Sequence, residues 1–505
     1  MSEWVDILTQ GKTALDSGDA PRASQLFRLG LDKYSDIPDA RQWLTFNLMI
    51  SDSLAVGPEV CIEHAPYLLS TPLNWDVKLY IIEQALKGSL PSSPHLETLR
   101  DLAVRTITTY KAIPHEKQDV NFISCLSITR HMERLFGADA IDPMFHTISR
   151  EDSYPVVCSL PSSGTRAADV AEANRLPRVI RSYQNNIVTP PREIGFRHVG
   201  KAYSVRLAEN TIMFDSQGAV LDLPYGPCPA FLREILERWF RQLQPQKQVR
   251  GTALFVGDYF SQSINYCHWT VDWMARIVAA RKAGLRFDAV IGSLPNRAPF
   301  QIATTEAVLD DGQTYYGFSE DDGLVEIEDL YFADNHAIRH LNHPLFRGDR
   351  ALAQDLRLAI RPDLPATSKG RRLYVPRRQT RRVTNEAEVF EILKKYGFEA
   401  IDTDAMSFAE QVDTFSQASA VAAPHGAALT NILFMPPGGH LLELFPPLAG
   451  SSAFYALAGA VDLTYSCFID DVTQGPNRDG ATEILFNTGD ILVDCAFVER
   501  WASRL

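Results

Sequence analysis

The sequence predicts an α/β protein, in which an all-α domain precedes two Rossmann-like domains that face a cleft. Two observations carry this prediction. Up to about residue 140, apolar residues recur at helical intervals. From residue 252 onwards, strands alternate with helices, and this order is typical of a parallel sheet with crossover connections. At 505 residues, the chain is long enough for several domains of ordinary size.

The helical domain is predicted over residues 1–150. Leu15, Ala23, Phe27 and Leu31 follow one another at roughly helical spacing. The SGD break among them resembles the turn inside a tetratricopeptide unit, but the sequence offers one tolerable copy only. A helical cap or a module that binds a protein partner is therefore favoured over a repeat array.

A linker is predicted over residues 151–180, because 159–177 are polar and rich in small residues. The first Rossmann-like domain, on the acceptor side, is expected over 181–365. Its first part alternates apolar and polar residues around DSQG, which predicts short strands or hairpins. TALFVGDYF, HWTVDWMARIVAARKAG and FDAVIGSLP then predict strand, helix and strand.

The second Rossmann-like domain, predicted over 366–505, has the clearest pattern. RRLYVP is a strand, and the helix after it has Asn385 as N-cap and Gly397 at its end. Ser407 and Glu410 form a capping box before the next helix. SAVAA and HLLELF are strands on either side of AALTNILFM, a short helix. Together these elements give a βαβαβαβ run.

Composition narrows the class of protein. The net charge of −13, from 49 Lys and Arg against 62 Asp and Glu, argues against a general nucleic-acid binder, which would be basic. Seven scattered cysteines without a CxxC pair fit a reducing compartment and give no zinc spacing. The amino terminus lacks a signal-peptide profile, and no apolar stretch reaches the roughly 20 residues of a membrane helix. We expect a cytoplasmic protein with at most peripheral membrane association.

An arginine-rich loop follows the strand RLYV. It contains Arg377, Arg378, Arg381 and Arg382. Ligands of open α/β sheets bind beyond the carboxyl ends of the strands, and guanidinium groups suit phosphate because they bind it bidentately. The alternative is a solvated basic loop. The place of the loop at a strand end, on an acidic protein, favours a phosphate site.

A second candidate is the turn between SAVAA and the following helix, with His425, Gly426 and Ala427. Small residues allow a ligand close to the backbone, and a helix amino terminus presents free N–H groups. His425 could donate to a phosphate oxygen, or it could make a structural hydrogen bond. The pattern is not GxGxxG, so a dinucleotide cofactor has no specific support.

Carboxylates supply the remaining candidates. Glu443, at the end of an apolar strand, could accept the two hydroxyls of a ribose or pair with the nearby arginines. His268 and Asp272 lie at i and i+4 on one helix, so they could form a general base or an ordinary polar pair. Asp258, after the strand ALFVG, is the rival base.

Taken together, these motifs resemble glycosyltransferase family 61. The resemblance is densest over 371–447, where RLYVPRR, RRVTNEAEV, FEAIDTDAMSFAEQV and APHGAALTNILFMPPGGHLLELFPP follow the family's order. It extends more weakly to NYCHWTVDWMARI and thinly to about residue 180. It implies a GT-B fold and inverting transfer from a nucleotide sugar, most often a UDP-sugar, without an essential metal.

The resemblance also assigns residues to roles. Positions of the donor site fall on Arg377, Arg382, Asn385, Glu386, His425, Gly426, Ala427, Asn431 and Glu443. The family's His and Asp in the amino-terminal domain correspond to His268 and Asp272. Pro376 departs from the pattern, because the family commonly has Ser before the arginine.

The resulting hypothesis is an inverting glycosyltransferase that acts on a glycan, lipid-linked or protein acceptor, by analogy in bacterial polysaccharide assembly. His268 or Asp272 would deprotonate the acceptor hydroxyl, and Arg377 or Arg382 with His425 would stabilise the leaving nucleoside diphosphate. The DTD and IDD segments read as turns or caps, so no metal cofactor is expected. The alternative is a non-catalytic nucleotide-sugar-binding or scaffold protein that uses its helical amino terminus for a partner. A different nucleotide-using enzyme, such as an epimerase, is the weakest option.

Overall fold

The computed structural model describes most of the chain, and all statements below concern these parts. They are residues 3–16, 19–55, 61–88, 95–112, 122–137, 142–145, 147–148, 153–161, 168–174, 193–207, 210–221, 228–257, 265–293, 295–333, 349–446, 451–470 and 490–505. The chain divides into two compact units. A helical unit combines Met1–Arg150 with Gln217–Asp222 and Pro227–Gln244, and an α/β unit contains Glu151–Ser216, Leu223–Gly226 and Pro245–Leu505.

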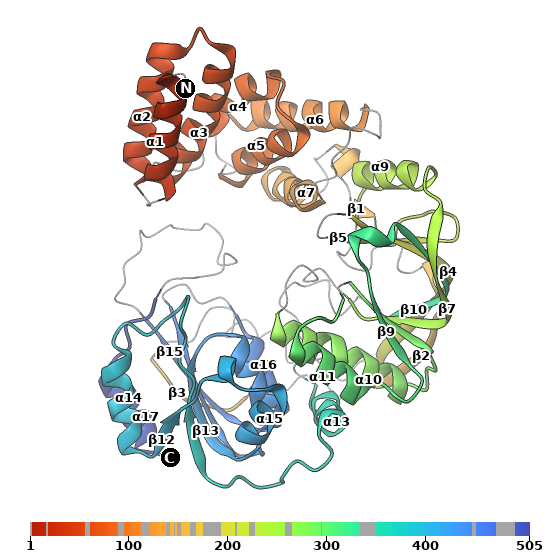
Figure 1. Cartoon of the computed structure of the whole chain (residues 1–505), viewed down its shortest axis with the longest axis vertical. Helices are drawn as coiled ribbons and strands as arrows, with labels where there is room; N and C mark the ends of the chain where they lie inside the picture. The colour runs from red at the N-terminus through yellow and green to blue at the C-terminus, as the bar shows by residue number, and fades with distance from the viewer. Residues whose placement is uncertain are drawn as a thin grey trace. The chain divides into compact units, whose positions relative to one another are not determined.

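The helical unit confirms the helical prediction for the amino-terminal region (Figure 1). Its elements are α1 (Glu3–Asp16), α2 (Ala20–Tyr34), α3 (Pro38–Ala55), α4 (Cys61–Ser70), α5 (Trp75–Gly88), α6 (Leu96–Ala112), α7 (Phe122–Phe136), η3 (Pro143–Phe145), β1 (Thr147–Ile148), β6 (Cys228–Pro229) and α9 (Ala230–Phe240). Phe27 and Leu44 are fully buried where α1, α2 and α3 pack together. A Cβ at Gly11 would lie 2.2 Å from the Phe27 ring, so only glycine allows this close approach of α1 and α2.

Helix α9 belongs to the helical unit, although the sequence predicted its residues to be part of the first Rossmann-like domain. The ring of Phe231 lies 5.8 Å from that of Phe145, in an edge-to-face arrangement. Glu234 pairs with Lys111 at 2.6 Å, and Arg233 donates to the Val220 carbonyl at 2.7 Å. An amphipathic helix has the same apolar stripe whichever unit covers it, so periodicity alone could not assign α9.

The first sheet of the α/β unit has the order β2-β4-β10-β7-β8-β9, with β5 paired to β4. Its strands are β2 (Val156–Pro161), β4 (Glu193–Leu207), β5 (Asn210–Asp215), β7 (Pro245–Phe255), β8 (Ala289–Gly292), β9 (Thr314–Gly317) and β10 (Leu324–Ala333). Strands β10, β7, β8 and β9 are parallel, whereas β2, β4 and β5 pair antiparallel. The antiparallel β4–β5 pair confirms a hairpin in this segment, but both strands precede most of DSQG, where the sequence placed the turn.

The second sheet is parallel throughout, in the order β12-β11-β13-β14-β15-β3. Its strands are β3 (Val170–Ala173), β11 (Arg371–Tyr374), β12 (Phe398–Ala400), β13 (Ala418–Pro424), β14 (His440–Phe445) and β15 (Thr464–Ile469). Figure 1 shows α14 (Glu386–Lys395) and α17 (Cys495–Ala502) on one face, with α15 (Phe408–Ser416) and α16 (Ala453–Ala460) on the other. The Rossmann-like prediction for this region is confirmed.

The segment predicted to be a linker is part of both sheets. Strand β2 pairs with β4 in the first sheet, and β3 pairs with β15 in the second. Asn174 then exchanges two hydrogen bonds with the backbone of Ile469, at 2.8 and 2.9 Å. Small polar residues indicate a loop when read locally, but pairing with a strand about 300 residues away overrides that local preference.

Three details of the second domain refine the prediction. The capping box of Ser407 and Glu410 is confirmed, and Gly397 has a left-handed φ of 78° after α14. Asn385 occupies the N-cap position, but its side chain bonds to both backbone groups of Val493 instead of capping the helix. The helix after His425 is a 3₁₀ helix, η10 (Ala427–Phe434).

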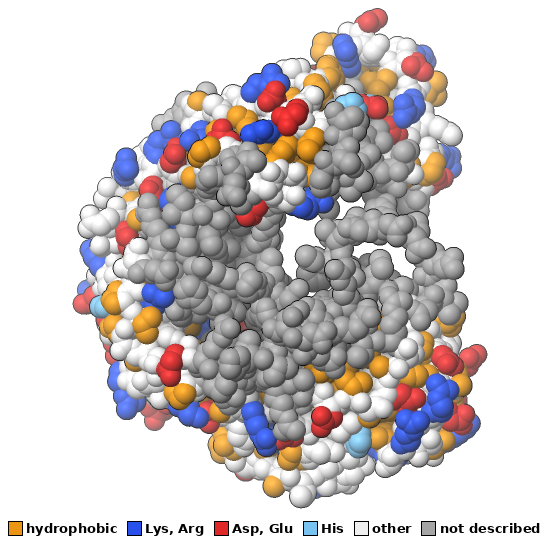
Figure 2. All heavy atoms as spheres, turned by 180° about the vertical axis from the view of Figure 1, so that it is seen from behind, with side chains coloured by type: hydrophobic (Ala, Val, Ile, Leu, Met, Phe, Trp, Pro, Cys, Tyr) orange, Lys and Arg blue, Asp and Glu red, His pale blue; other side chains and the backbone are white. Residues whose placement is uncertain are grey.

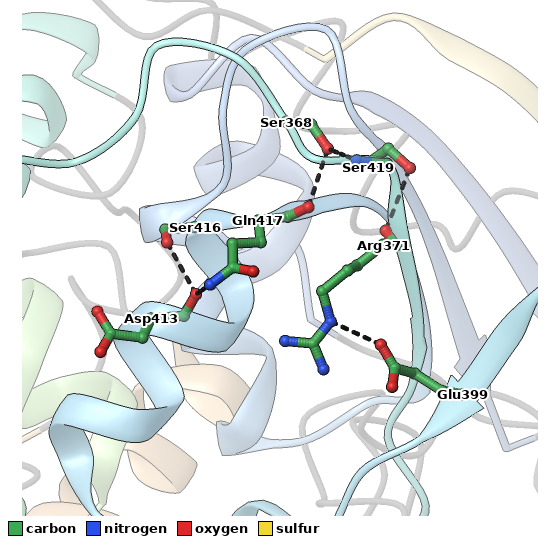
Figure 3. A network of polar contacts seen from close by, with 8 residues as sticks. Ser368, Arg371, Glu399, Asp413, Ser416, Gln417 and Ser419 are labelled. Carbon is green, nitrogen blue, oxygen red and sulfur yellow. Dashed lines mark hydrogen bonds and ion pairs between the residues drawn. The ribbon is translucent and has the colours of Figure 1, made fainter.

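A polar network fixes the amino ends of β11 and β13 (Figure 3). The Ser368 hydroxyl donates to the Gln417 carbonyl at 3.0 Å, and the Ser419 hydroxyl donates to the Arg371 carbonyl at 3.1 Å. The Arg371 guanidinium meets Glu399 at 2.6 Å. Each charge and hydroxyl here has an ordinary protein partner, as expected for a structural end of a sheet.

Helices α10 (Met274–Lys282), α11 (Pro299–Val308) and α13 (Arg350–Ile360) complete the α/β unit. They share one apolar core with α15, η10 and α16, so residues from both sheets lie in a single cluster. On the face in Figure 2, basic and acidic side chains are interspersed among the described residues. Within the described ranges, no helix combines the length and apolar character needed to cross a bilayer.

Candidate active site

The order in which the chain adds strands to the second sheet reverses between β11 and β13. From β11 the chain continues to β12 on one side, whereas β13, β14 and β15 follow one another on the other side. The loops after β11 and β13 therefore leave in opposite directions, and ligands of open α/β sheets bind at such a point. The sequence-predicted Arg377 and His425 follow these two strands, so the fold brings them together.

Arg377 lies across the start of the His425 turn. Its Nη1 donates to the His425 carbonyl at 3.0 Å, and its Nε and Nη2 donate to the carbonyl and hydroxyl of Thr380 at 2.7 and 3.2 Å. All three acceptors are neutral. Burial lowers the pKa of Arg377, while the charge of Asp404 opposes this shift. The guanidinium is thus held in place without a charged partner in direct contact.

Arg381 is the most unusual residue of the site. Its backbone has a left-handed φ of 58°, which is costly for a residue with a side chain. Its buried Nε finds no acceptor among the described residues. Burial and then the neighbouring charge of Arg377 lower the pKa of Arg381 to about 10, against the pull of Glu443. Two guanidiniums therefore share one partly buried region, and an anion would relieve their repulsion.

His425, Glu443 and Tyr465 form a hydrogen-bonded chain behind these arginines. Glu443 is fully buried on β14, where its Oε1 meets His425 Nδ1 at 2.5 Å and its Oε2 accepts from the Tyr465 hydroxyl at 2.7 Å. The imidazole stacks on Phe445 with centroids 5.2 Å apart. A carboxylate on Nδ1 fixes the orientation of a histidine, so His425 directs Nε2 away from Glu443.

The position of Glu443 differs from both sequence interpretations. Its two oxygens are used by His425 and Tyr465, so it does not form the expected salt bridge with an arginine. With no exposed surface, Glu443 offers no oxygen for direct contact with a ribose, and its link to the site is the hydrogen bond with His425. Tyr465, which the sequence analysis missed, gave no signal because it lies inside a strand with an apolar pattern.

The structure shows why position 426 is a glycine, which the sequence alone did not reveal. Its backbone is extended, so no left-handed conformation requires glycine. A Cβ at this position, however, would lie 1.8 Å from Nη1 of Arg377. The small residue thus gives room to a guanidinium of the protein itself, which in turn lies at the site. Ala427, the first residue of η10, is half-buried.

The other predicted donor residues lie apart from this cluster. Arg378 is exposed, and Arg382 forms an exposed ion pair with Asp490 at 2.6 Å, which raises the pKa of Arg382. Glu386 accepts from the Tyr374 hydroxyl at 3.0 Å. In the described structure, Arg381 and not Arg382 is the second guanidinium beside Arg377, because the left-handed turn at Arg381 directs the chain away after it.

Asn431 is completely buried and makes structural contacts only. Its carbonyl oxygen accepts from the Tyr266 hydroxyl at 2.7 Å. Its amide donates to Gln411 Oε1 at 2.8 Å and to the Ala428 carbonyl at 3.1 Å. The predicted ligand contact of Asn431 is therefore replaced by a contact with Tyr266, near the start of the helix that carries His268.

His268 and Asp272 meet as the sequence predicted. His268 Nδ1 lies 2.7 Å from Asp272 Oδ2, and their side chains are 16% and 13% exposed. Both lie on a π-helical turn, η6 (His268–Trp273), which continues into α10. π-helical turns are rare in proteins overall, but those that occur often lie at functional sites. Asp258, the rival base, lies outside the described residues.

The fold is α/β, and two guanidiniums and an oriented histidine lie at the switch point of its parallel sheet, where enzymes of this class bind their ligands. The comparison with known families makes this class specific: residues 266–442, 177 of the chain's 505, match the family model Glycosyltransferase 61. The chain is therefore a glycosyltransferase with a family 61 domain. No curated protein matches the chain.

The matched region starts at Tyr266 and includes the π-helical turn, the arginine loop and the His425 turn. It ends at Leu442, one residue before Glu443. Among the described residues, no group of three or more His, Cys, Asp or Glu side chains is arranged to hold a metal ion. The match of this domain supports a glycosyltransferase, and it does not identify the sugar donor or the acceptor.

Proposed function

We propose that the chain is an inverting, GT-B-type glycosyltransferase that uses a nucleoside-diphosphate sugar, with UDP as the expected nucleotide. The observation that carries this proposal is the pair Arg377 and Arg381, two partly buried guanidiniums that the described protein leaves without a carboxylate in contact. A diphosphate supplies the missing negative charge. Two arginines also suit its geometry, since each guanidinium can bind oxygens bidentately.

Departure of the nucleoside diphosphate builds negative charge on its terminal oxygens. Arg377, Arg381 and the N–H groups at the start of η10 lie at the switch point, where they can stabilise that charge in the transition state. This electrostatic role is the one a divalent cation would otherwise have, so we propose transfer without a metal. His425 adds a third donor, oriented by Glu443 and Tyr465.

Inversion also requires a base for the acceptor hydroxyl. We propose His268 for this role, because the Asp272 carboxylate on Nδ1 orients the ring and stabilises the imidazolium that forms on proton transfer. The pair is mostly buried but retains some exposure. We propose a glycan, lipid-linked or protein hydroxyl as acceptor, in cytoplasmic polysaccharide assembly, and the family resemblance alone supports this part.

A donor screen tests this function. Wild-type protein is incubated with a panel of UDP-, GDP- and dTDP-sugars, and free nucleoside diphosphate is measured. We expect release from one UDP-sugar, and a loss of about 100-fold in Arg381→Gln because a charged hydrogen-bonding partner of the diphosphate is removed. Arg371→Gln is the matched control, since Arg371 pairs with Glu399 at the opposite end of the same strand.

Two results would contradict the proposal. One is release from no donor, together with no binding of UDP, GDP or dTDP; that outcome would favour the alternative of a scaffold that uses the helical unit for a partner. The other is equal turnover by Arg381→Gln and Arg371→Gln, which would remove the arginine pair from the donor site.

A further inference from the structure

Tyr266 and Asn431 connect the helix that carries His268 to the helix that follows His425. The Tyr266 hydroxyl donates to Asn431 Oδ1 at 2.7 Å. Asn431 extends this hydrogen-bonded connection to α15, because its amide donates to Gln411 Oε1 at 2.8 Å. Buried carboxamides with donors and acceptors fully used hold their neighbours in one arrangement.

The same chain of hydrogen bonds reaches the loop beside Arg377. The Gln411 amide donates to the carbonyls of Thr403 and Met406 at 3.0 and 3.3 Å. Asp404 lies in this loop, and its charge acts on Arg377. One polar network therefore extends from the start of η6, through η10 and α15, to the arginine side of the donor site.

The Tyr266 ring is held independently of its hydroxyl. It lies edge-to-face on Phe300 of α11 at 5.1 Å and on Phe408 of α15 at 6.3 Å, measured between ring centroids. Burial raises the pKa of Tyr266 well above its usual value, so the phenol remains protonated and continues to donate. Removing the hydroxyl alone would break the connection and leave the aromatic packing in place.

We propose that Tyr266 is a positioning residue, which holds the His268–Asp272 pair in register with the donor site through Asn431 and Gln411. The proposal rests on the function proposed above for the roles of the two sites. Transfer requires the acceptor oxygen, its base and the donor carbon to be aligned, and a displacement of about 1 Å can cost about 100-fold in rate. The Tyr266–Asn431 hydrogen bond joins the two helices directly, so its loss would alter their register.

Steady-state kinetics of Tyr266→Phe test this proposal. Tyr316→Phe is the matched control, because Tyr316 also donates to a single side chain, Asp322 at 3.0 Å, in the first sheet. With the donor identified by the screen, we expect kcat to fall about 10-fold or more in Tyr266→Phe, while KM for the donor changes less than about 2-fold. Tyr316→Phe should match the wild type.

A double variant shows whether Tyr266 acts through His268. In His268→Ala, the added Tyr266→Phe substitution should cause no further loss of kcat, because the register of an absent base has no effect. An undiminished kcat in Tyr266→Phe would overturn the proposal. So would an equal fall in Tyr316→Phe, or a full further loss in the double variant.

Hydrogen exchange of the unliganded protein decides the proposal if the wild type neither releases nucleotide from any donor nor binds UDP, GDP or dTDP, the result that refutes the proposed function separately. Tyr266→Phe should then speed amide exchange in both 266–273 and 427–434 by about 5-fold, since one net hydrogen bond is worth about 1 kcal/mol. Exchange in α13 should not change, and Tyr316→Phe should affect neither segment. Unchanged exchange in these two segments would overturn the proposal.

Discussion

Arginine side chains have different roles at the carboxyl ends of the two sheets of the α/β unit. Beyond the first sheet, Arg276 donates to the carbonyls of Val256 and Gly257 at 2.6 and 2.7 Å. Arg206 donates to those of Ser293 and Phe318, the residues that follow β8 and β9. These guanidiniums close strand ends with hydrogen bonds, so their role is structural.

Beyond the second sheet, the arginines exceed what the fold requires. Arg381 lies next to Arg377, has a left-handed backbone, and has its pKa lowered by burial and by the like charge of Arg377. Strain and like-charge proximity of this kind persist where the arrangement serves a ligand. The difference between the two ends supports the second sheet as the proposed donor site, although both contain strand-end arginines.

Opposite effects of two equivalent substitutions give the largest test of this comparison. Arg276→Met should lower the midpoint of thermal unfolding by about 5 °C or more, because two buried carbonyls lose their donor at about 1–3 kcal/mol each. Arg381→Met should leave the midpoint unchanged or raise it, while UDP affinity falls about 100-fold. Calorimetry of unfolding and of UDP binding measures both. If Arg381→Met unfolds as readily as Arg276→Met, the arginine is structural and the comparison fails.

The Gly426→Ala variant tests whether the site depends on the place of the Arg377 guanidinium. A Cβ would lie 1.8 Å from Nη1, so the guanidinium must move, and we expect UDP affinity to fall about 10-fold. In an Arg377→Ala background the same substitution should have little further effect. Additive losses in the double variant would show that Gly426 matters for another reason, such as direct approach of the ligand.

Glu443→Gln separates orientation of His425 from direct ligand contact. Gln keeps the shape and still accepts from Tyr465, but it removes the buried charge beside His425. We expect donor turnover to fall about 10- to 100-fold, as for other residues that orient a ligand-binding histidine, and UDP affinity to change less. Loss of uridine binding in this variant would contradict the indirect role and restore a ribose contact.

The pH dependence of anion binding is the smallest expected effect. The pKa of Arg381 is about 10, lowered from its usual value by burial and by Arg377. The cationic form that binds an anion is therefore complete well below pH 10 and is lost as the pH rises through about 10. Affinity for sulfate, whose charge does not change in this range, should be constant from pH 7 to 9 and fall above about 10. Constant affinity up to pH 11 would contradict the lowered pKa of Arg381.

The sequence predicted the second domain well because its local signals agree with its fold. The capping box at Ser407, the glycine at 397 and the alternation of strands and helices each depend on neighbouring residues. The linker and α9 were assigned differently because their partners lie far along the chain: β3 pairs with β15, and α9 packs in the helical unit. Local sequence patterns do not encode contacts between residues that lie far apart in the chain.

The candidate site shows the same limit at the level of single residues. Strand ends and the switch point bring together Arg377 and His425, which their positions after strands indicated. Which arginine joins them depends on the left-handed turn at Arg381, and a run of four arginines does not encode that choice. Tyr465 and Tyr266 were missed because an aromatic residue in an apolar segment has no pattern that marks its hydroxyl as functional.

Isothermal titration with UDP and with uridine tests the central claim most directly, that the carboxyl end of the second sheet binds a diphosphate through Arg377 and Arg381. The account predicts that wild type and Arg371→Gln bind UDP equally, that uridine binds at least about 100-fold more weakly, and that Arg381→Gln loses most of this difference. Equal binding of UDP by Arg381→Gln and wild type, or equal affinities for UDP and uridine, would contradict it.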